Sequence, residues 1–268
     1  KQVDSTVNLD NLAAKTAGSS GADLANIANE AAIIAARRDA KKISNADLTE
    51  AFEKVAIGPE RKTKVMNEKE KELTAYHEAG HAIVGHILPD SDPVHKVTII
   101  PRGSTGGVTW FLPPEDKSYT SVYEFKDILA RAMGGRVAEK ILYGDDGITT
   151  GAGSDLRKAT EIARDMIIDQ GMGTKLRDQV FHDDNGGMVF DKMTHSRPYS
   201  DATAKLIDEE VEALIREAAV RAESVIQTNR KSLEKLANAL LEQETLEEEA
   251  VVEILKDAVL PKDARLHG

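Results

Sequence analysis

The chain has 268 residues, of which 41% are hydrophobic, 30% are charged and only 4% are aromatic. This length is enough for one large domain or two modest ones, and the abundance of Ala, Leu, Glu and Lys favours a helical protein. There is no cysteine, which excludes disulfides and thiolate metal sites, so any metal must be held by His and carboxylate side chains. The net charge of −11 disfavours nucleic-acid binding, because contacts to phosphates need clustered Lys and Arg.

The beginning of the chain predicts a small helical unit. Ser20 is placed as the N-cap of a helix over Leu24–Arg38, whose apolar residues follow a helical spacing. Ser44 repeats this cap before a shorter helix over Leu48–Val55, and Gly58–Lys62 reads as a linker. The core of such a unit is thin, which indicates that the unit belongs to a larger domain.

The centre of the chain predicts one long helix followed by two strands. The helix runs from about Asn67 to Leu88 and ends before two prolines. Alternating apolar residues predict a strand over Val94–Pro101 and a second strand over Gly106–Leu112, joined by a Gly-containing turn. Because Trp110 and Phe111 point to opposite faces of the second strand, we expect one of them to fill the core.

From Tyr123 the pattern is helical almost to the end of the chain. A loop over Thr149–Asp155 leads into a helix over Leu156–Gln170, and Asp201–Arg230 predicts one long amphipathic helix. Thr245–Glu248 is expected to cap the last helix.

We expect no signal peptide in this sequence, and no apolar run in it approaches the roughly 20 residues that span a bilayer. The first residue is Lys, so we expect the chain to start inside a longer protein, and any membrane anchor would lie upstream of it.

The segment His77-Glu78-Ala79-Gly80-His81 lies on the long central helix and predicts a metal site. Side chains four residues apart share one face of a helix, so His77 and His81 can point at one ion. Glu78 could act as the general base on a water whose pKa a zinc ion lowers, while the zinc polarises the scissile carbonyl. Gly80 has no side chain and would let another segment approach closely. The helix is apolar nearly all round, and a buried helix needs a reason to carry two His and a Glu.

Zinc bound for hydrolysis takes a third protein ligand, and spacing alone does not choose it. A metzincin would place a third His where Ile87 stands, and His86 is rotated away from the metal face. Two carboxylates remain, Glu139 on a helix with two adjacent glycines and Asp155 before the following helix. Each also has an ordinary structural explanation: an ion pair with Arg136 for Glu139, and a favourable helix dipole for Asp155.

These segments in this order resemble the FtsH-type ATP-dependent, membrane-anchored AAA+ zinc proteases. The resemblance covers almost the whole chain and includes the lid subdomain of the AAA module, the zinc helix, the strand after it and the segment that supplies the third ligand. The matching stretches are, in that order, Ser20–Asn26 with Asn29–Ala32 and Ala35–Arg38, Thr74–Ala82, Pro93–Gly103, and Thr150–Thr160.

The resemblance implies a mainly α fold with two parts. Residues 1–62 would be an incomplete helical AAA lid subdomain with its linker, and residues 63–268 a mostly helical zincin-like peptidase domain with a small β-sheet. Gly21 and Ala22 resemble lid residues that approach the adenine of ATP. The phosphate loop, Walker B acids and arginine fingers of the family are absent from this chain. ATP would therefore be bound only by the full-length protein, and no ATPase activity is expected from this portion.

For the metal site, the resemblance implies zinc held by His77, His81 and Asp155, with Glu78 as the general base and zinc-bound water as the nucleophile. Glu139 becomes a structural residue, or one that orients a ligand histidine.

The implied function is that of an ATP-dependent zinc metalloendopeptidase. It would cut unfolded polypeptides and membrane-protein substrates that an AAA+ unfoldase ring delivers, and it would work as a homo-hexamer. Upstream transmembrane segments would anchor the full-length protein, with this portion, soluble by itself, on the cytoplasmic or organelle-equivalent side. An extended substrate would add to the strand edge near Val108–Leu112. The alternative is a ring-forming assembly scaffold with a structural or inactive zinc site, which the intact Glu78 argues against.

Overall fold

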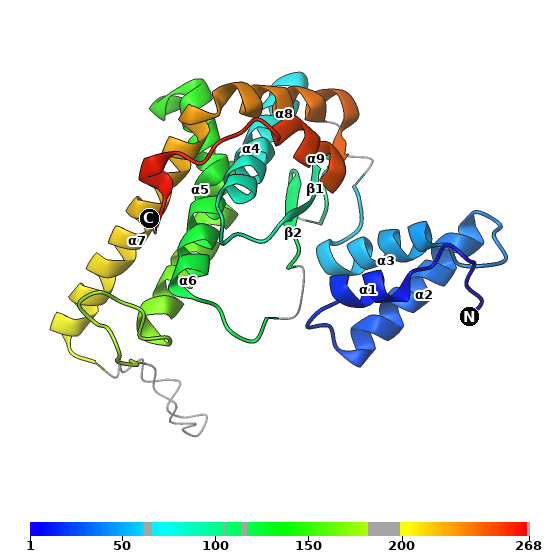
Figure 1. Cartoon of the computed structure of the whole chain (residues 1–268), viewed down its shortest axis with the longest axis horizontal. Coiled ribbons are helices and arrows are strands. Elements are labelled where there is room, and N and C mark those ends of the chain that lie inside the picture. The colour runs from blue at the N-terminus through cyan, green and yellow to red at the C-terminus, as the bar shows by residue number, and fades with distance from the viewer. Residues whose placement is uncertain (62–65, 104, 114–116, 182–198, 267–268) are drawn as a thin grey trace. The chain divides into compact units, whose positions relative to one another are not determined.

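The computed structural model describes residues 1–61, 66–103, 105–113, 117–181 and 199–266 (Figure 1). Most of these residues are helical and a few form a small sheet, which confirms the predicted mainly α fold. The chain forms two compact units, residues 1–79, 92–119 and 234–256 in the first, and residues 80–91, 120–233 and 257–268 in the second. The boundaries cut through α4 (Glu68–Ile87) and α8 (Arg230–Gln243), so each unit takes part of both helices. The expected domain boundary at residues 62 and 63 lies outside the described residues.

Three helices begin the first unit: α1 (Leu9–Lys15), α2 (Gly21–Arg37) and α3 (Asn45–Ile57). Both predicted N-caps are confirmed, because Ser20 forms a capping box with Asp23 and Ser44 forms one with Asp47. The apolar faces of α2 and α3 pack together into one small core, whose buried members are Ile27, Ala31, Ile34, Ala35, Ile43, Leu48, Ala51 and Phe52.

The sheet of the first unit has three antiparallel strands in the order β2-β1-β3, with bounds Val94–Thr98 for β1, Val108–Phe111 for β2 and Thr245–Glu247 for β3. The expectation that Thr245–Glu248 caps the last helix was wrong, because its first three residues form β3. α9 (Glu248–Leu255) follows, and its N-cap Glu247 makes no side-chain cap hydrogen bond. Leu246 pairs with Val97 of β1, and both are fully buried. A three-residue strand is too short to show an alternating pattern, so only its distant partner identifies it.

Trp110 joins the sheet to the N-terminal helices. Its ring packs on Phe52 of α3 with 4.9 Å between ring centroids, and His95 of β1 lies edge-on to it at 5.2 Å. Burial, helped by the charge of Lys15, lowers the pKa of His95 to about 4, so this imidazole is neutral at neutral pH. Trp110 therefore packs against the core of the N-terminal helices, as expected for one of the two aromatic residues, although Trp110 and Phe111 are both half-buried.

A buried cluster of charges makes a second connection between α3 and the sheet. The carboxylate of Glu53, only 4% exposed, accepts hydrogen bonds from Lys96 of β1 and from Arg102 at 3.1 Å. Arg102 also donates to Glu60 at 2.6 Å. Burial by itself would lower the pKa of Lys96, but its hydrogen bonds to Glu53 and Glu247 raise that pKa, so Lys96 stays charged.

The second unit is built on three helices that pack on one another: α5 (Val122–Tyr143), α6 (Gly153–Ile168) and α7 (Asp201–Thr228) (Figure 1). The predicted helix over Asp201–Arg230 is confirmed to within two residues, since α7 ends at Thr228 and α8 begins at Arg230. Asp127 of α5 and Arg221 of α7, both buried, form an ion pair at 2.6 Å within this packing.

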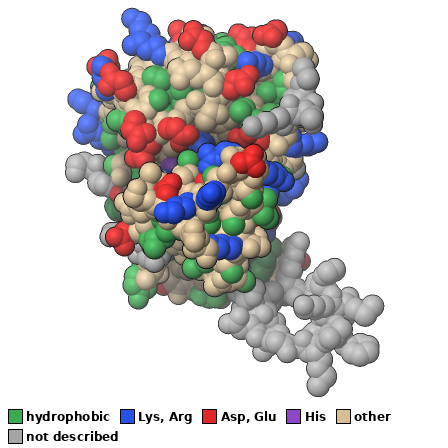
Figure 2. Space-filling view, turned by 90° about the vertical axis from the view of Figure 1, so that its right-hand side faces the viewer, with side chains coloured by type: hydrophobic (Ala, Val, Ile, Leu, Met, Phe, Trp, Pro, Cys, Tyr) green, Lys and Arg blue, Asp and Glu red, His purple; other side chains and the backbone are tan. Residues whose placement is uncertain are grey.

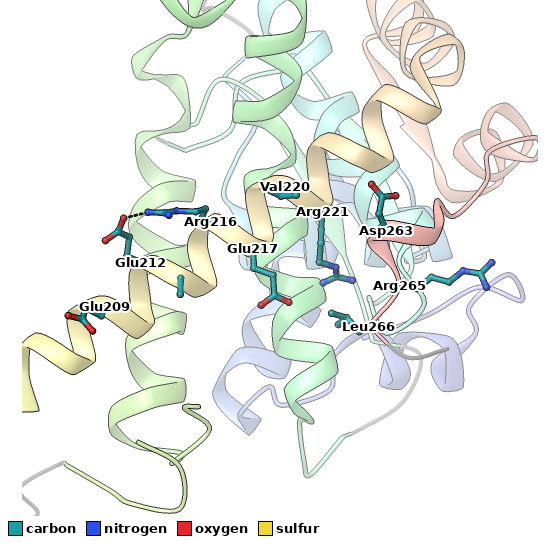
Figure 3. A pocket seen from close by; sticks show the side chains of 10 residues that line it. Glu209, Glu212, Arg216, Glu217, Val220, Arg221, Asp263, Arg265 and Leu266 are labelled. Atoms are coloured by element: carbon teal, nitrogen blue, oxygen red, sulfur yellow. Dashed lines mark hydrogen bonds and ion pairs between the residues drawn. The ribbon is translucent and has the colours of Figure 1, made fainter. Parts of the chain in front are cut away.

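A pocket of about 570 Å³ opens between α7 and residues 263–266 near the end of the chain (Figure 3). Its charges are largely paired: Arg216 with Glu212, Glu217 with Lys126 at 2.8 Å, and Arg221 with Asp127. Acidic and basic side chains are likewise interspersed over the face of the molecule shown in Figure 2. In the part of the chain that the structure describes, no helix combines the length and the apolar character needed to cross a membrane.

Candidate metal centre

The motif residues lie in the middle of α4, which begins one residue after the predicted start. The helix is apolar on nearly all sides here, and Ala75, Ala79, Ala82, Ile83 and Val84 are completely buried. Three ionisable side chains share this environment: His77, Glu78 and His81 are 9%, 6% and 8% exposed. Because buried polar groups are costly unless they have partners, the partners of these side chains indicate the chemistry of the site.

His81 has a partner on each ring nitrogen, and both partners lie in the second unit. Its Nδ1 lies 2.8 Å from the carbonyl oxygen of Arg131, and its Nε2 lies 3.4 Å from Oδ2 of Asp155. A carbonyl oxygen can only accept, so in the neutral ring the proton is on Nδ1 and the lone pair of Nε2 faces Asp155. A carbonyl that binds the second ring nitrogen in this way is typical of a metal-ligating histidine.

Asp155 is the third residue of α6, in its first turn, and not in the preceding loop as expected. His77 lies one turn before His81 on the same continuous helix. His77, His81 and Asp155 each offer one ligand atom, and these atoms all lie within 4.8 Å of one another. Two imidazoles and one carboxylate form a donor set that catalytic zinc uses, with a fourth position left for water or substrate. The residues present therefore fit a zinc ion.

The other candidates stand outside this group of three. Among the described residues, neither Glu139 nor His86 belongs to the group of potential metal ligands formed by His77, His81 and Asp155. His86 lies in the last turn of α4, and burial lowers its pKa.

Glu78 follows His77 in α4, and its carboxylate is contacted by two residues of the first unit. The hydroxyl of Thr109 on β2 lies 2.7 Å from Oε2 of Glu78 and 3.0 Å from its main-chain oxygen. Gly107, just before β2, passes so close that an added Cβ would lie 2.8 Å from Oε1 of Glu78. The contacts of Thr109 and Gly107 with Glu78 were not predicted from the sequence. The hydrogen bond from Thr109, for example, joins positions 31 residues apart. The centre thus combines three metal donors with a neighbouring carboxylate that is a candidate base.

Two family models match the chain. The AAA+ lid domain matches residues 6–50, and peptidase family M41 matches residues 64–254. This chain belongs to peptidase family M41. Together with the FtsH relatives of this chain, these matches confirm the predicted resemblance to the FtsH-type proteases.

Curated relatives of this M41 chain share close to half of its residues. It is 44% identical over 259 residues to ATP-dependent zinc metalloprotease FtsH 3 of Synechocystis sp., covering 95% of this chain and 42% of the relative. It is 49% identical over 253 residues to ATP-dependent zinc metalloprotease FtsH of Chloroflexus aggregans, covering 93% and 39%. The FtsH of Bacillus subtilis is 42% identical over 264 residues, covering 98% and 41%. The chain therefore spans about two fifths of the length of these relatives.

Glu139 of the M41 chain is 1% exposed and binds the segment that leads to Asp155. Its Oε2 accepts hydrogen bonds from the N–H of Thr149 at 2.8 Å and from the Thr149 hydroxyl at 3.1 Å. Arg136, its expected ion-pair partner, donates to the carbonyl oxygen of Thr149 at 3.0 Å. Because Thr149 precedes the turn before α6, Glu139 and Arg136 both help to set the start of the helix that carries Asp155.

Gly21 and Ala22, predicted to approach adenine, form the first turn of α2, where both are exposed.

Gly80 and Gly134 let α4 and α5 of the M41 chain touch backbone to backbone. A Cβ added to Gly80 would lie 2.4 Å from the carbonyl oxygen of Gly134, and one added to Gly134 would lie 2.5 Å from that of Gly80. The predicted close approach at Gly80 is confirmed, and its partner is one of the two adjacent glycines noted in the sequence.

We expect Gly80→Ala to lower the free energy of unfolding by about 1–3 kcal/mol or more, because the helices must separate to admit the methyl group. Chemical denaturation would measure the change. Gly153→Ala is the matched control, since a Cβ at this helical glycine meets nothing within 4 Å. Equal stability of the two variants would contradict the prediction.

Proposed function

We propose that this chain is the peptidase portion of an ATP-dependent zinc metalloendopeptidase, with zinc held by His77, His81 and Asp155. The observation that carries the proposal is the convergence of these three donors beside the buried carboxylate of Glu78. Membership of family M41 and the zinc metalloprotease names of the relatives support the same conclusion. A purely structural metal site would have no use for a base, so these observations do not favour the assembly scaffold.

The residues of the site would divide the chemistry among them. When bound, zinc would supply Lewis-acid polarisation of the scissile carbonyl and would make water a stronger acid. Glu78 would accept a proton from the attacking water and pass it to the leaving amine, which is general acid–base catalysis. The carbonyl of Arg131 would keep the ring of His81 in the tautomer and orientation that ligation needs.

The substrate would be an unfolded polypeptide that adds to the edge of β2. Among the described strands, β2 pairs only with β1, since it lies at the end of the sheet order. An extended peptide placed along this edge would satisfy its backbone through ladder hydrogen bonds and would lie next to the strand that contacts Glu78. An unfolded chain can adopt this extended form at any of its segments.

Membership of the family supports a proposal about the partners of the full-length protein. We propose that residues 1–62 complete an AAA+ module as its lid, that residues 63–268 are the peptidase domain, and that Gly21 and Ala22 line the adenine side of the ATP site. Membrane-protein substrates, a homo-hexameric ring and upstream anchoring in a membrane, with the peptidase on the cytoplasmic or organelle-equivalent side, belong to the same proposal. The match to the AAA+ lid domain and the ATP-dependent relatives support it.

The proposal is tested by zinc content and by cleavage of an unstructured reporter peptide, which needs no unfolding and hence no motor. We expect the purified chain to bind about one zinc ion and to cleave the peptide, and a chelator to stop the cleavage. A chain that binds zinc tightly without cleaving the peptide would favour the scaffold instead.

The third ligand is tested by comparing Asp155→Ala with Glu139→Ala. Removing a ligand should weaken zinc binding by more than the roughly 10–100-fold that loss of a supporting group costs, so Asp155→Ala should have the larger effect. Competition with a chromogenic chelator measures both affinities. The reverse order would show that the assignment of Asp155 is wrong.

A further inference from the structure

The hydroxyl of Thr109 donates a hydrogen bond to the carboxylate of Glu78, and the zinc chemistry does not use this hydroxyl. We propose that Thr109 is a positioning residue for peptide hydrolysis: its hydroxyl holds the Glu78 carboxylate in the orientation from which it acts as the base. This inference rests on the proposed function and adds to it a residue outside the HEAGH segment.

The contact has the geometry of a strong hydrogen bond. Oγ1 of Thr109 lies 2.7 Å from Oε2 of Glu78, within the range of O–H···O bonds to a carboxylate. The hydroxyl has one hydrogen, and its distance to the main-chain oxygen of Glu78 is longer, at 3.0 Å. We therefore assign the hydrogen to the carboxylate. The bond uses one lone pair of Oε2, so the carboxylate keeps lone pairs that can accept a proton from water.

Thr109 is itself held rigidly. It pairs with Val97 of β1, the central strand, and Val97 pairs in turn with Leu246 of β3. Val97 is fully buried, so the register of β2 in this region is strongly specified. A hydroxyl on such a strand can define the place of a flexible side chain.

Gly107 lies close to Oε1, the other oxygen of the Glu78 carboxylate. A Cβ on Gly107 would lie 2.8 Å from Oε1 and 2.9 Å from Cγ of Glu78, so this segment closely borders the side chain. Glu78 has three rotatable side-chain bonds, and it is 6% exposed. The bond from Thr109 to Oε2 and the close approach of Gly107 to Oε1 together restrict where the carboxylate can lie. A small misplacement of a catalytic group can cost a hundredfold in rate, so this confinement has consequences for turnover.

The test compares Thr109→Val, which keeps the shape and removes the donor, with Thr109→Ser, which keeps the donor. We expect Thr109→Val to lower kcat for the reporter peptide by about 10–100-fold, with KM within about twofold. Thr109→Ser should stay within about threefold of the unchanged chain. Both variants should keep their zinc and unfold in one cooperative transition, which a general loss of structure would not allow. The midpoint of Thr109→Val should fall, because the buried carboxylate of Glu78 loses a donor.

Two results would overturn the proposal: a kcat of Thr109→Val within about twofold of the unchanged chain, or an equal loss in Thr109→Ser. Crystal structures of the two variants provide a readout that needs no activity. The Glu78 carboxylate should keep its place in Thr109→Ser and leave it in Thr109→Val, and an unmoved carboxylate in Thr109→Val would also refute the idea. If the unchanged chain does not cleave peptide, the proposed function fails, while the crystal structures still decide the role of Thr109.

Discussion

The Glu78→Gln variant is expected to lose peptide hydrolysis by a factor of about 10²–10⁴ while it keeps its zinc. Gln has almost the shape of Glu, and its amide oxygen can still accept the hydrogen bond from Thr109. The amide cannot take up a proton at neutral pH, so general-base catalysis stops. The three metal donors are other side chains, so the affinity for zinc should change little.

Initial rates of reporter cleavage and zinc per chain measure the two halves of this prediction. Glu72→Gln is the matched control, because Glu72 lies on the same helix and is exposed. It makes the same chemical change without reaching the site, so its rate should match that of the unchanged chain. Hydrolysis retained in Glu78→Gln would refute the role of Glu78 as the base, and loss of zinc would show that Glu78 maintains the metal site.

The Glu53→Ala variant is expected to lose about 3–5 kcal/mol of unfolding free energy, because it leaves two buried cations without their shared carboxylate. Lys96 is 9% and Arg102 is 6% exposed, so water cannot replace Glu53 as their partner. Arg102 keeps Glu60 and Lys96 keeps Glu247, but both of these acids are more exposed. The cost therefore comes mainly from burying charge that is incompletely neutralised.

Fluorescence of Trp110 during chemical denaturation reports on this region specifically. Trp110 is the only tryptophan of the chain, and its ring packs on Phe52, the neighbour of Glu53. Glu50→Ala, an exposed position on the same helix, is the control and should change stability by less than about 0.5 kcal/mol. Equal midpoints for the two variants would show that the buried cluster contributes nothing to stability.

The features of the fold that were predicted correctly depend on residues that are close together in the sequence. The capping boxes at Ser20 and Ser44 each involve residues three apart, so they can be read directly from the sequence. The central helix was predicted to within about a residue at each end, because its apolar spacing and its following prolines act locally. The same reasoning placed His77 and His81 on one face of a helix, since one turn of helix determines their relation.

The features that were not predicted from the sequence depend on contacts between segments that are distant in the chain. β3 is defined by its pairing with β1, and the hydroxyls of Thr98 and Thr245 that meet there are 147 positions apart. Trp110 is partly covered because its ring packs on Phe52 of α3, which is distant in the sequence. In the same way, the partner of Gly80 at Gly134, the partners of Glu139 at Thr149, and the contact of Thr109 with Glu78 required the folded chain.

The sequence by itself therefore determined a mainly α protein with two histidines one turn apart and a glutamate between them, because helical periodicity is a local property. Spacing could not choose between Glu139 and Asp155, and only the resemblance to a family pointed to Asp155. The tertiary structure brings the carboxylate of Asp155 to 3.4 Å from Nε2 of His81 and directs Glu139 to Thr149. This arrangement supports Asp155 as the third ligand. Only the tertiary structure could show it, because the approach of α6 to α4 depends on how whole helices pack, and residues 74 positions apart in the sequence carry no local signal of their distance in space.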